Sequence, residues 1–575
     1  MKKLATYLKP YKLQIMIALA LVFLQSMAEL YLPRLMSDII DQGVVNGDVP
    51  YIWKIGGFML LVAAFGMLSA IIASYFSSRA SSGFGRDLRN VVFSHIQQFS
   101  QEEFDQLGTA SLITRTTNDI NQVQFVLMLT LRVMVTAPIM AIGGIIMALT
   151  TDVKLSLIFL ISVPVLGLAI FLIARKGIPL FKLIQKRLDK VNQVLREKLV
   201  GIRVIRSFNR VAFEEERFDQ ASKDLTDTSI RVNKIMALMM PVMLLIINFS
   251  TIAIVWFGGL RIDNGNMQVG DLMAFIQYAM QIMFSFMLVS MMFVLLPRAQ
   301  VSANRIGEVL ELQPVIKNPE NVKKETDLHG YVTFHHVSFS YPNAEKAALS
   351  NISFEARPGQ TTAIIGGTGS GKSTLINLIP RFYDVSEGQV LVNARDVRDW
   401  DLAELRKIIG FVPQKSVLFT GTVAENIQYG KTDATEPEIE HAAKIAQAED
   451  FIEEMNDHYQ TVISQGGTNI SGGQKQRLSI ARALVRKPEI YLFDDSFSAL
   501  DFKTDAKLRA ALKSETEEAT VILIAQRVST VIDADQIIVL DEGKIAGIGT
   551  HTELLETSSV YREIVSSQLS EEELA

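Results

Sequence analysis

The chain has no cysteine among its 575 residues, which excludes disulfide bonds and metal sites built on thiolates. It also lacks an excess of positive charge, because the formal net charge is -5 at pH 7, and no nucleic-acid partner is therefore expected. Long apolar runs are missing from residues 331–575, which read as a soluble protein, but they are frequent in residues 1–300. The composition therefore predicts a membrane half followed by a soluble half.

Six apolar runs in the first half are long enough to cross a bilayer as helices, which takes about 20 mostly apolar residues. Their expected bounds are 14–33, 54–76, 132–150, 155–174, 236–258 and 271–296. A cleavable signal peptide is the alternative for the first run, but the run is long enough to span and lacks a convincing small-residue cleavage site. The sequence thus predicts an all-α membrane domain with six transmembrane helices.

Lysine and arginine are distributed unevenly among the connections between these runs. They are frequent in 77–124 and very frequent in 175–235, whereas 34–52 and 259–270 each contain one arginine and no lysine. Because positively charged connections stay in the cytoplasm, we expect both termini and the two basic stretches on that side. The expected location is the cell membrane, with the soluble half in the cytoplasm.

The two basic stretches have helical periodicity, so the membrane helices are expected to extend well beyond the bilayer. We expect their tips, near 104–116 and 205–216, to contact a cytoplasmic domain, and the alternative is a charged, solvated helix. The expected domains are a transmembrane domain 1–300, a linker 301–330, a nucleotide-binding α/β domain 331–565 and an acidic tail 566–575.

A glycine-rich loop lies between an apolar, strand-like run and a helix-like run. Its spacing is G-x4-G-K-S, in which backbone N–H groups and a helix N-terminus bind phosphates. Lys372 is expected to reach the β- and γ-phosphates, and the Ser373 hydroxyl is expected to bind Mg²⁺. The predicted ATP-binding residues here are Gly366, Gly367, Thr368, Gly369, Ser370, Gly371, Lys372, Ser373 and Thr374.

Two further motifs come after the phosphate loop along the chain. Residues 491–494 form a hydrophobic run that ends in Asp494, an acid suited to positioning Mg²⁺. Just upstream, a Ser-Gly-Gly-Gln turn opens an apparent helix over 475–485, and such a turn is a second phosphate-binding device. Its residues are Ser471, Gly472, Gly473 and Gln474.

The ordered set of Tyr341, the phosphate loop, Gln414, the Ser-Gly-Gly-Gln turn and Asp494 resembles the nucleotide-binding domain of an ABC transporter. Six spans followed by one such domain resemble an ABC exporter half-transporter over essentially the whole chain. The resemblance implies that Tyr341 stacks on adenine and that Gln414 senses Mg²⁺ and the membrane domain. It also implies a head-to-tail dimer, in which the Ser-Gly-Gly-Gln turn of each chain completes the ATP site on the other chain's phosphate loop.

Two positions depart from the family pattern. The family has a glutamate general base directly after the Mg²⁺-positioning aspartate, where this chain has Asp495, and a histidine that contacts the γ-phosphate, where this chain has Gln526. Aspartate is one methylene shorter than glutamate, and an error of about 1 Å can slow catalysis by about 100-fold. Glutamine donates a hydrogen bond but does not titrate. Both changes fall in one ATP site, which is therefore expected to hydrolyse ATP slowly.

A homodimer would carry this defect in both ATP sites, although the Ser471–Gln474 turn is well formed. The sequence therefore favours a heterodimer with a second, non-identical half-transporter chain, whose catalytic glutamate and histidine form the competent site. This resembles the degenerate chain of bacterial, LmrCD-like heterodimeric multidrug exporters. The expected transported molecules are amphipathic drugs or lipids.

The sixth span carries a methionine-rich face, and methionine suits surfaces that accept varied apolar ligands. At 100° per residue its members fall within an arc of about 80°. They are Met273, Gln277, Met280, Phe284, Met287 and Met291. The face is a candidate substrate pathway, and helix packing or lipid contact is the alternative interpretation.

Two other functions stay open at this point. One is a lipid flippase or a peptide exporter, although the peptide version is weakened because no peptidase-like domain precedes the first span. The other is a non-pumping regulator or channel, gated by ATP binding alone. The absence of an inserted regulatory segment argues against this second alternative.

Overall fold

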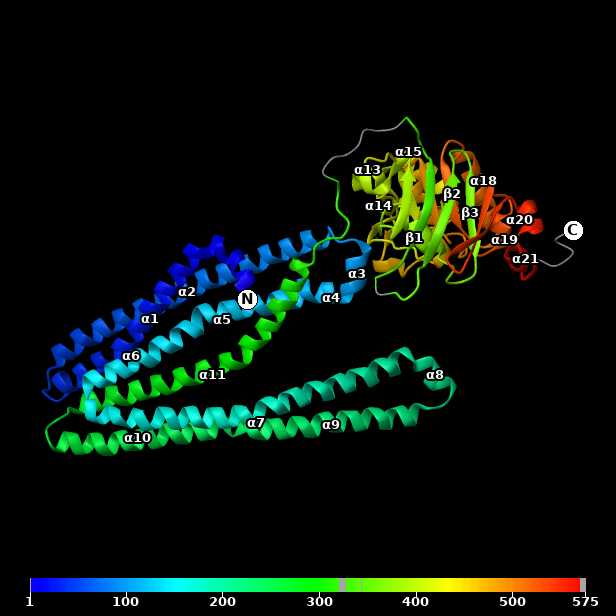
Figure 1. Cartoon of the computed structure of the whole chain (residues 1–575). Coiled ribbons are helices and arrows are strands. Elements are labelled where there is room, and N and C mark those ends of the chain that lie inside the picture. The colour runs from blue at the N-terminus through cyan, green and yellow to red at the C-terminus, as the bar shows by residue number, and fades with distance from the viewer. Residues whose placement is uncertain (1, 320–326, 343, 569–575) are drawn as a thin grey trace. The chain divides into compact units, whose positions relative to one another are not determined.

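The computed structural model describes residues 2–319, 327–342 and 344–568. Its contacts divide the chain into two compact units. The membrane unit comprises Met1–Gln97 and Thr109–Leu312, and the ATPase unit comprises Gln98–Gly108 and Gln313–Ala575 (Figure 1). Along the chain, the short segment Gln98–Gly108 of the ATPase unit lies between helices α2 and α4 of the membrane unit.

The described membrane unit is entirely helical. Its elements are η1 (Lys2–Tyr11), α1 (Lys12–Asp38), η2 (Ile39–Val44), α2 (Val49–Ile96), α4 (Thr109–Thr114), η3 (Arg115–Asp119), α5 (Ile120–Leu129), η4 (Thr130–Met134), α6 (Val135–Thr151), α7 (Val153–Val200), α8 (Ile202–Ser207), α9 (Val211–Ala237), α10 (Met239–Asp263) and α11 (Val269–Glu311). Six helical segments of the described chain are long and apolar enough to cross a membrane, which confirms the predicted number of spans.

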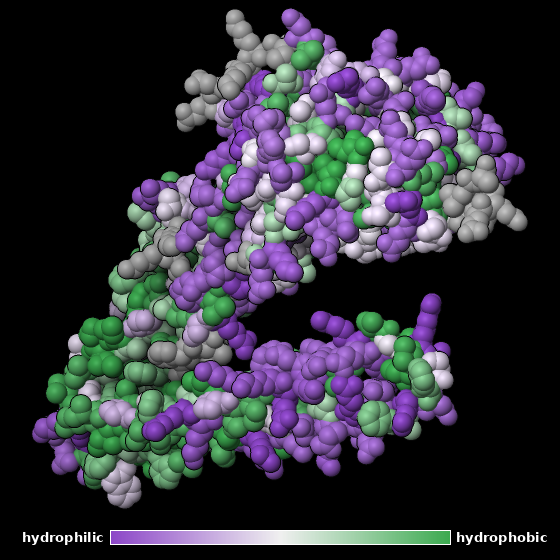
Figure 2. All heavy atoms as spheres, turned by 45° about the vertical axis from the view of Figure 1, so that its right-hand side comes forward, coloured by the Kyte–Doolittle hydropathy of each residue, from purple (hydrophilic) through white to green (hydrophobic). Residues whose placement is uncertain are grey.

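The helices α2 and α7 each contain 48 residues. At 1.5 Å per residue each is about 72 Å long, more than twice the thickness of the hydrocarbon core. On the face that Figure 2 shows, apolar side chains gather over one end of the membrane unit, whereas the arm formed by α7 and α9 is mostly hydrophilic and carries apolar side chains at its tip near α8. Side chains of Val200, Val204 and Phe208 are exposed at this tip.

The last membrane helix is longer than the sequence suggests. α11 ends at Glu311, so it includes the first eleven residues of the predicted linker 301–330. The reason is an apolar face that packs against the unit and buries Ala303, Ile306 and Val309. Residues 320–326 of the predicted linker lie outside the described residues.

The ATPase unit is an α/β domain. Its strands are β1 (Val332–Phe339), β2 (Leu349–Ala356), β3 (Thr361–Gly366), β4 (Glu387–Val392), β5 (Arg395–Asp396), β6 (Ile409–Val412), β7 (Gly421–Thr422), β8 (Val462–Ile463), β9 (Ile490–Asp494), β10 (Thr520–Ile524), β11 (Gln536–Asp541) and β12 (Lys544–Gly549). Its α-helices are α3 (Gln101–Leu107), α12 (Lys372–Leu378), α13 (Leu402–Lys407), α14 (Val423–Gln428), α15 (Glu436–Ile445), α16 (Glu449–Glu453), α17 (Gly472–Leu484), α18 (Phe502–Glu515), α19 (Val528–Val531), α20 (His551–Thr557) and α21 (Ser559–Ser566). The predicted acidic tail thus begins in α21, and residues 569–575 lie outside the described residues.

The central sheet has the strand order β12-β11-β3-β10-β9-β6. Every pairing in it is parallel except that of β11 with β12. β9 and β10 consist entirely of buried residues, as expected for central parallel strands covered on both faces. Because β3, β10 and β9 are adjacent and parallel, the residues just beyond their carboxyl ends meet at one edge of the sheet.

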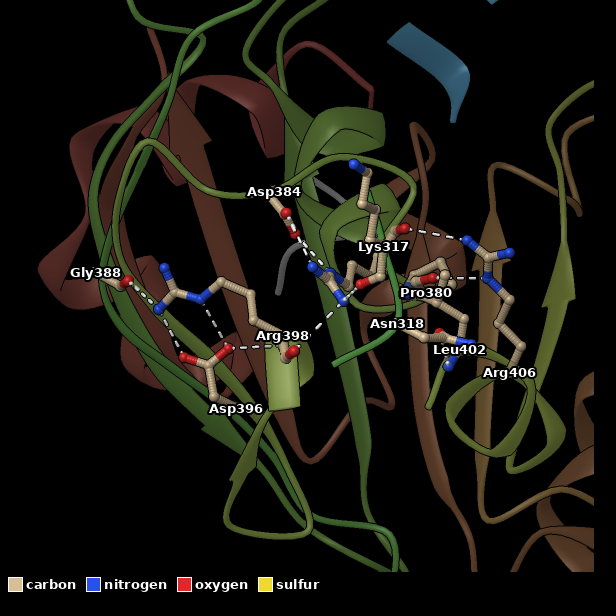
Figure 3. A network of polar contacts seen from close by, with 10 residues as sticks. Lys317, Asn318, Pro380, Asp384, Gly388, Asp396, Arg398, Leu402 and Arg406 are labelled. Carbon is tan, nitrogen blue, oxygen red and sulfur yellow. Dashed lines mark hydrogen bonds and ion pairs between the residues drawn. The ribbon is translucent and has the colours of Figure 1, made fainter. Parts of the chain in front are cut away.

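The segment Arg381–Asp384, just after α12, forms hydrogen bonds with two segments that are distant in sequence, one around Lys317 and one in α3. The Arg381 guanidinium pairs with the Asp384 carboxylate at 2.7 Å and donates to the Lys317 carbonyl at 3.2 Å, which holds the start of the linker (Figure 3). The Tyr383 hydroxyl donates to the Asp105 carboxylate of α3 at 2.8 Å. Residues 104–107 of the predicted tip thus lie in α3, which is part of the ATPase unit.

Candidate functional site

The glycine-rich loop leaves β3 and enters α12 as the sequence predicts. The Lys372 ammonium lies inside the loop and donates to the carbonyl oxygens of Gly366 and Gly367 at 2.8 and 2.7 Å. Burial lowers the pKa of Lys372, and the carboxylates of Asp494 and Asp495 oppose that shift. A Cβ atom at Gly366 would overlap the Leu540 carbonyl, so only glycine fits there. The loop thus presents one buried cation and backbone N–H groups at a helix N-terminus, which is an anion site.

Asp494, at the end of β9, lies beside the phosphate loop. The Ser373 hydroxyl of α12 donates to the Asp494 carboxylate at 2.9 Å. Burial raises the pKa of Asp494, and the bond from Ser373 opposes the shift. A hydroxyl and a carboxylate oxygen at hydrogen-bonding distance suit Mg²⁺, which takes oxygen ligands from one or two carboxylates, waters and phosphates. Ser373 and Asp494 would hold the ion, and the ion would neutralise charge on the phosphates.

Asp495 is the centre of a cluster of amides. Its carboxylate oxygen Oδ2 accepts from Gln526 Nε2 at 2.8 Å and from Gln414 Nε2 at 3.2 Å. Burial raises the pKa of Asp495, and the hydrogen bonds from Gln414 and Ser498 oppose the shift. The amide nitrogen of Gln414 is engaged by this bond, and its amide oxygen is of the ligand type that could bind Mg²⁺. The two positions that depart from the family pattern are therefore in direct contact with each other.

Tyr341 contacts Thr374, which follows the phosphate loop directly along the chain. The Tyr341 hydroxyl is hydrogen-bonded to the Thr374 hydroxyl at 3.0 Å. The Tyr341 ring packs edge-on against Phe339 and Tyr383, with centroid distances of 4.9 and 5.4 Å. The ring is therefore fixed beside the phosphate loop with part of its surface exposed, as a base-stacking platform requires.

The Ser471–Gln474 turn forms the N-terminus of α17, close to the predicted start of that helix. Ser471 and Gln474 make a capping box, in which the Ser471 N–H donates to Gln474 Oε1 at 2.8 Å and the Gln474 N–H donates to the Ser471 hydroxyl at 3.3 Å. A Cβ atom at Gly472 would meet no described atom within 4 Å. Among the described residues, no hydrogen bond joins this turn to the phosphate loop of the same chain.

One residue that contacts the site carries no signal in the sequence. The Gln568 side chain donates to the Gln526 carbonyl oxygen and accepts from the Val528 N–H, both at 2.8 Å. A lone glutamine after the last helix belongs to no motif, so only the tertiary structure brings it to this place.

The methionine-rich face of α11 is largely exposed in this chain. Met273, Gln277, Met280 and Phe284 are exposed, and Met287 is partly buried. The opposite face is buried against the other membrane helices through Phe275, Tyr278 and Ile282. The side chain of Met291 lies outside the described residues. Met287 packs against the cluster of Leu166, Met243 and Met283. Packing within the chain does not account for the exposed Met273 and Met280, which are available to lipid, a partner chain or a transported molecule.

Both units match known protein families. Residues 15–286 match the ABC transporter transmembrane region, and residues 349–498 match the ABC transporter family. This chain belongs to the ABC transporters. An uncharacterized ABC transporter ATP-binding protein of Mycobacterium tuberculosis is 46% identical over 98% of this chain and 97% of its own length. The ATP-dependent lipid A-core flippase of Chromobacterium violaceum is 32% identical over 99% of this chain and 97% of its own length.

A solved bacterial Atm1-family ABC exporter with ATP bound has the same fold. Its TM-score is 0.81 at 26% identity, over 97% of this chain and 100% of that chain. This ABC transporter is thus an exporter half-transporter, a multi-pass membrane protein and an ATPase coupled to transport. Its ATPase unit binds ATP, with Mg²⁺ as the usual partner.

Proposed function

We propose that this chain is one subunit of a heterodimeric exporter of amphipathic drugs or lipids, and that its own ATP site binds ATP firmly but hydrolyses it slowly. The observation that carries the proposal is the contact between Gln526 and Asp495 beside a complete phosphate loop. Binding and hydrolysis use different residues of this site, and only the residues for hydrolysis depart from the family pattern.

The binding residues have the chemistry that ATP requires. Lys372 supplies a buried positive charge for the β- and γ-phosphates, and the N-terminus of α12 adds its positive potential. Tyr341 provides an exposed ring beside the loop for the adenine. Ser373 and Asp494 supply the oxygen atoms for Mg²⁺. The site is therefore suited to hold the nucleotide in a sandwich between two chains.

The hydrolytic residues are poorly suited to activate water. A general base must lie within hydrogen-bond reach of the attacking water. The Asp495 side chain is one methylene shorter than glutamate, and one of its carboxylate oxygens already accepts from two amides. Gln526 donates a hydrogen bond to the Asp495 carboxylate but has no imidazole that could titrate. Both features favour an ATP site that retains ATP through many transport cycles.

The Ser471–Gln474 turn supports a second chain. Its helix N-terminus is capped and its Gly472 faces open space, so no described part of this chain requires a glycine there. A nucleotide held on another chain's phosphate loop would explain the glycines, because they let phosphate oxygens approach the backbone closely. If that second chain carries the family's glutamate and histidine, the site completed by Ser471–Gln474 is the productive one.

The substrate class is inferred from the membrane unit and a relative. The exposed methionines of α11 form an adaptable apolar surface, and a lipid A-core flippase is among the relatives. In the proposed orientation, both termini and the ATPase unit lie in the cytoplasm. A lipid flippase or peptide exporter is the nearest alternative. An ATP-gated regulator or channel that does not pump is the more distant alternative.

The deciding experiment compares the chain purified alone with the complex it forms with an untagged partner co-purified from its own cells. We expect little ATPase activity from the chain alone and full activity from the complex. Equal turnover by the chain alone would overturn the heterodimer proposal. The same complex in proteoliposomes, given ATP and a fluorescent dye, separates a pump from a gate, because only a pump moves the dye against its gradient.

A further inference from the structure

The segment 526–528 comes after β10 and carries the glutamine that contacts Asp495. Its position is fixed by contacts from two directions. The Arg527 guanidinium donates to the Ser498 carbonyl at 3.3 Å and lies over the Phe502 ring, 5.0 Å from its centroid. On the other side, Gln568 reaches it from the end of the described chain. A residue that lies beyond the last described helix of the ATPase unit thus forms two hydrogen bonds with the segment that carries Gln526.

The Gln568 amide fits this segment in a specific way. Its nitrogen donates to the Gln526 carbonyl, and its oxygen accepts from the Val528 N–H, both at 2.8 Å. These two backbone groups belong to residues i and i+2, which is the pair that a neighbouring strand would engage in a ladder. A side-chain amide offers one donor and one acceptor in a single plane. A carboxylate could satisfy Val528 alone, and alanine could satisfy neither.

The backbone of Gln568 is held in place by its neighbours, although the Gln568 side chain is exposed. It comes directly after α21, whose Tyr561 and Val565 are buried in the main core of the ATPase unit. The Gln568 N–H donates to the Val565 carbonyl at 3.0 Å, so the residue continues the last turn of that helix. The amide is thus presented from a packed element, which makes the two bonds to 526–528 a positional restraint.

We propose that Gln568 is a positioning residue for the ATP site: its side-chain amide clamps the backbone of 526–528 and so holds Gln526 against Asp495 and toward the γ-phosphate. The inference rests on the proposed function and on the position of Gln526, at which the family has a histidine that contacts the γ-phosphate. Gln568 itself touches neither nucleotide nor Asp495. Its effect is therefore expected on ATP, which has a γ-phosphate, and not on ADP, which lacks one.

The test measures equilibrium binding of Mg-ATP and Mg-ADP to the full-length chain purified alone, which contains one phosphate loop. Gln568→Ala is expected to weaken ATP binding about fivefold and ADP binding less than about twofold, since a neutral hydrogen bond contributes about that factor. Gln568→Glu keeps the acceptor for Val528 but loses the donor to the Gln526 carbonyl, so we expect it to behave like the alanine variant. Ser567→Ala is the matched control, because the Ser567 hydroxyl donates to the Ile564 carbonyl of its own helix, and it should change neither affinity.

A double-mutant cycle with Gln526→Ala separates positioning from a general structural role. In the Gln526→Ala background, Gln568→Ala should add less than about a twofold further loss of ATP affinity, because the side chain that it positions is gone. Additive losses would overturn the proposal. So would equal weakening of ATP and ADP by Gln568→Ala together with a lower unfolding midpoint, since that pattern reports loss of α21 packing.

Binding of both nucleotides to Lys372→Ala distinguishes a failure of the proposed ATP site from a failure of the positioning role of Gln568. The substitution should weaken both nucleotides strongly if the phosphate loop is the ATP site. If it weakens neither, the proposed ATP site is wrong and the role of Gln568 falls with it. If it weakens both while Gln568→Ala changes neither, the ATP site stands and only the positioning role is wrong.

Discussion

Two glycine-rich helix N-termini lie in one ATPase unit, and their surroundings differ. At the start of α12, the phosphate loop is enclosed by its own chain: a Cβ at Gly366 would overlap the Leu540 carbonyl, and Gly371 has a φ of 95° with the Ala348 carbonyl against it. At the start of α17, Gly472 faces open space, and a Cβ built at Gly473 would lie 3.2 Å from the nearest atom, a backbone carbonyl oxygen.

This difference indicates that packing within the chain requires the glycines of the phosphate loop more strictly than those of the Ser471–Gln474 turn. The glycines at Gly366 and Gly371 are required by the fold of this chain, whether or not a nucleotide binds. Gly472 satisfies no packing requirement within the described chain, and Gly473 is only moderately crowded, by one backbone carbonyl oxygen. In the proposed function, a nucleotide held by a second chain would require glycine at this place, and substitutions in the two turns test that difference.

The largest expected effect comes from Gly473→Asp in the complex with the partner chain. Aspartate adds bulk and negative charge where the γ-phosphate of the partner-held ATP is expected, so ATPase and dye efflux should each fall by about 100-fold or more, as when an electrostatic contact to the reacting group is lost. Both are measured on the same proteoliposomes.

Gly473→Ala is the control that separates bulk from charge, because its Cβ lies at 3.2 Å from the Ala499 carbonyl and so requires only a small adjustment. ATP binding to this chain's own phosphate loop should be unchanged in both variants. Full transport by Gly473→Asp would mean that the α17 turn contacts no productive nucleotide.

The second largest effect is a gain of activity. Asp495→Glu combined with Gln526→His should raise hydrolysis at this chain's own site by about tenfold or more, because it restores the reach of the base and an imidazole at the γ-phosphate. The measurement uses a complex whose partner has its catalytic glutamate replaced by glutamine, so that the other site is silent. Asp495→Glu alone is the control, and unchanged ATPase in the double variant would locate the defect elsewhere.

A smaller loss is expected from Lys372→Ala in the complex. Nucleotide binding at this chain's site should weaken by at least about tenfold, because a buried cation opposite the phosphates is lost. Efflux should fall only a few-fold, since the affected site is the slow one. The contrast therefore predicts an order: Gly473→Asp is more damaging to transport than Lys372→Ala. The reverse order would assign the productive site to this chain's own phosphate loop.

The smallest effect concerns the segment just after α12. Tyr383 holds α3 through its hydroxyl, and burial, reinforced by the Asp105 carboxylate, raises the pKa of this phenol. Tyr383→Phe should lower the free energy of unfolding by about 1 kcal/mol, the contribution of one hydrogen bond. Tyr459→Phe is the matched control, because the buried Tyr459 hydroxyl has no hydrogen-bond partner among the described residues, so its removal should cost nothing. Thermal unfolding of both variants checks the difference, and equal midpoints would show that the bond to α3 contributes no stability.

Much of the fold was predictable because its signals are local. A run of about 20 apolar residues indicates a membrane helix by itself. All six predicted spans coincide with helical segments of the structure, although the third crosses from η4 into α6 and the fifth from α9 into α10. The glycine-rich loop was predictable between a strand and a helix, since its spacing defines both ends. The end of α11 was placed too early, because residues 301–311 are stabilised by packing of Ile306 and Val309 and carry no transmembrane pattern.

The sequence by itself determined the two halves of the chain, the phosphate loop and the two positions, Asp495 and Gln526, at which the chain departs from its family. Only the tertiary structure decided that one oxygen of Asp495 accepts from two amides, that α3 belongs to the ATPase unit, and that Gln568 holds the backbone beside Gln526. For Asp495 and Gln526, the physical reason is the parallel pairing of β9 and β10, which brings the ends of strands far apart in sequence to one edge. α3 and Gln568 are placed by individual long-range hydrogen bonds. Side chains that meet in this way leave no periodic pattern along the chain.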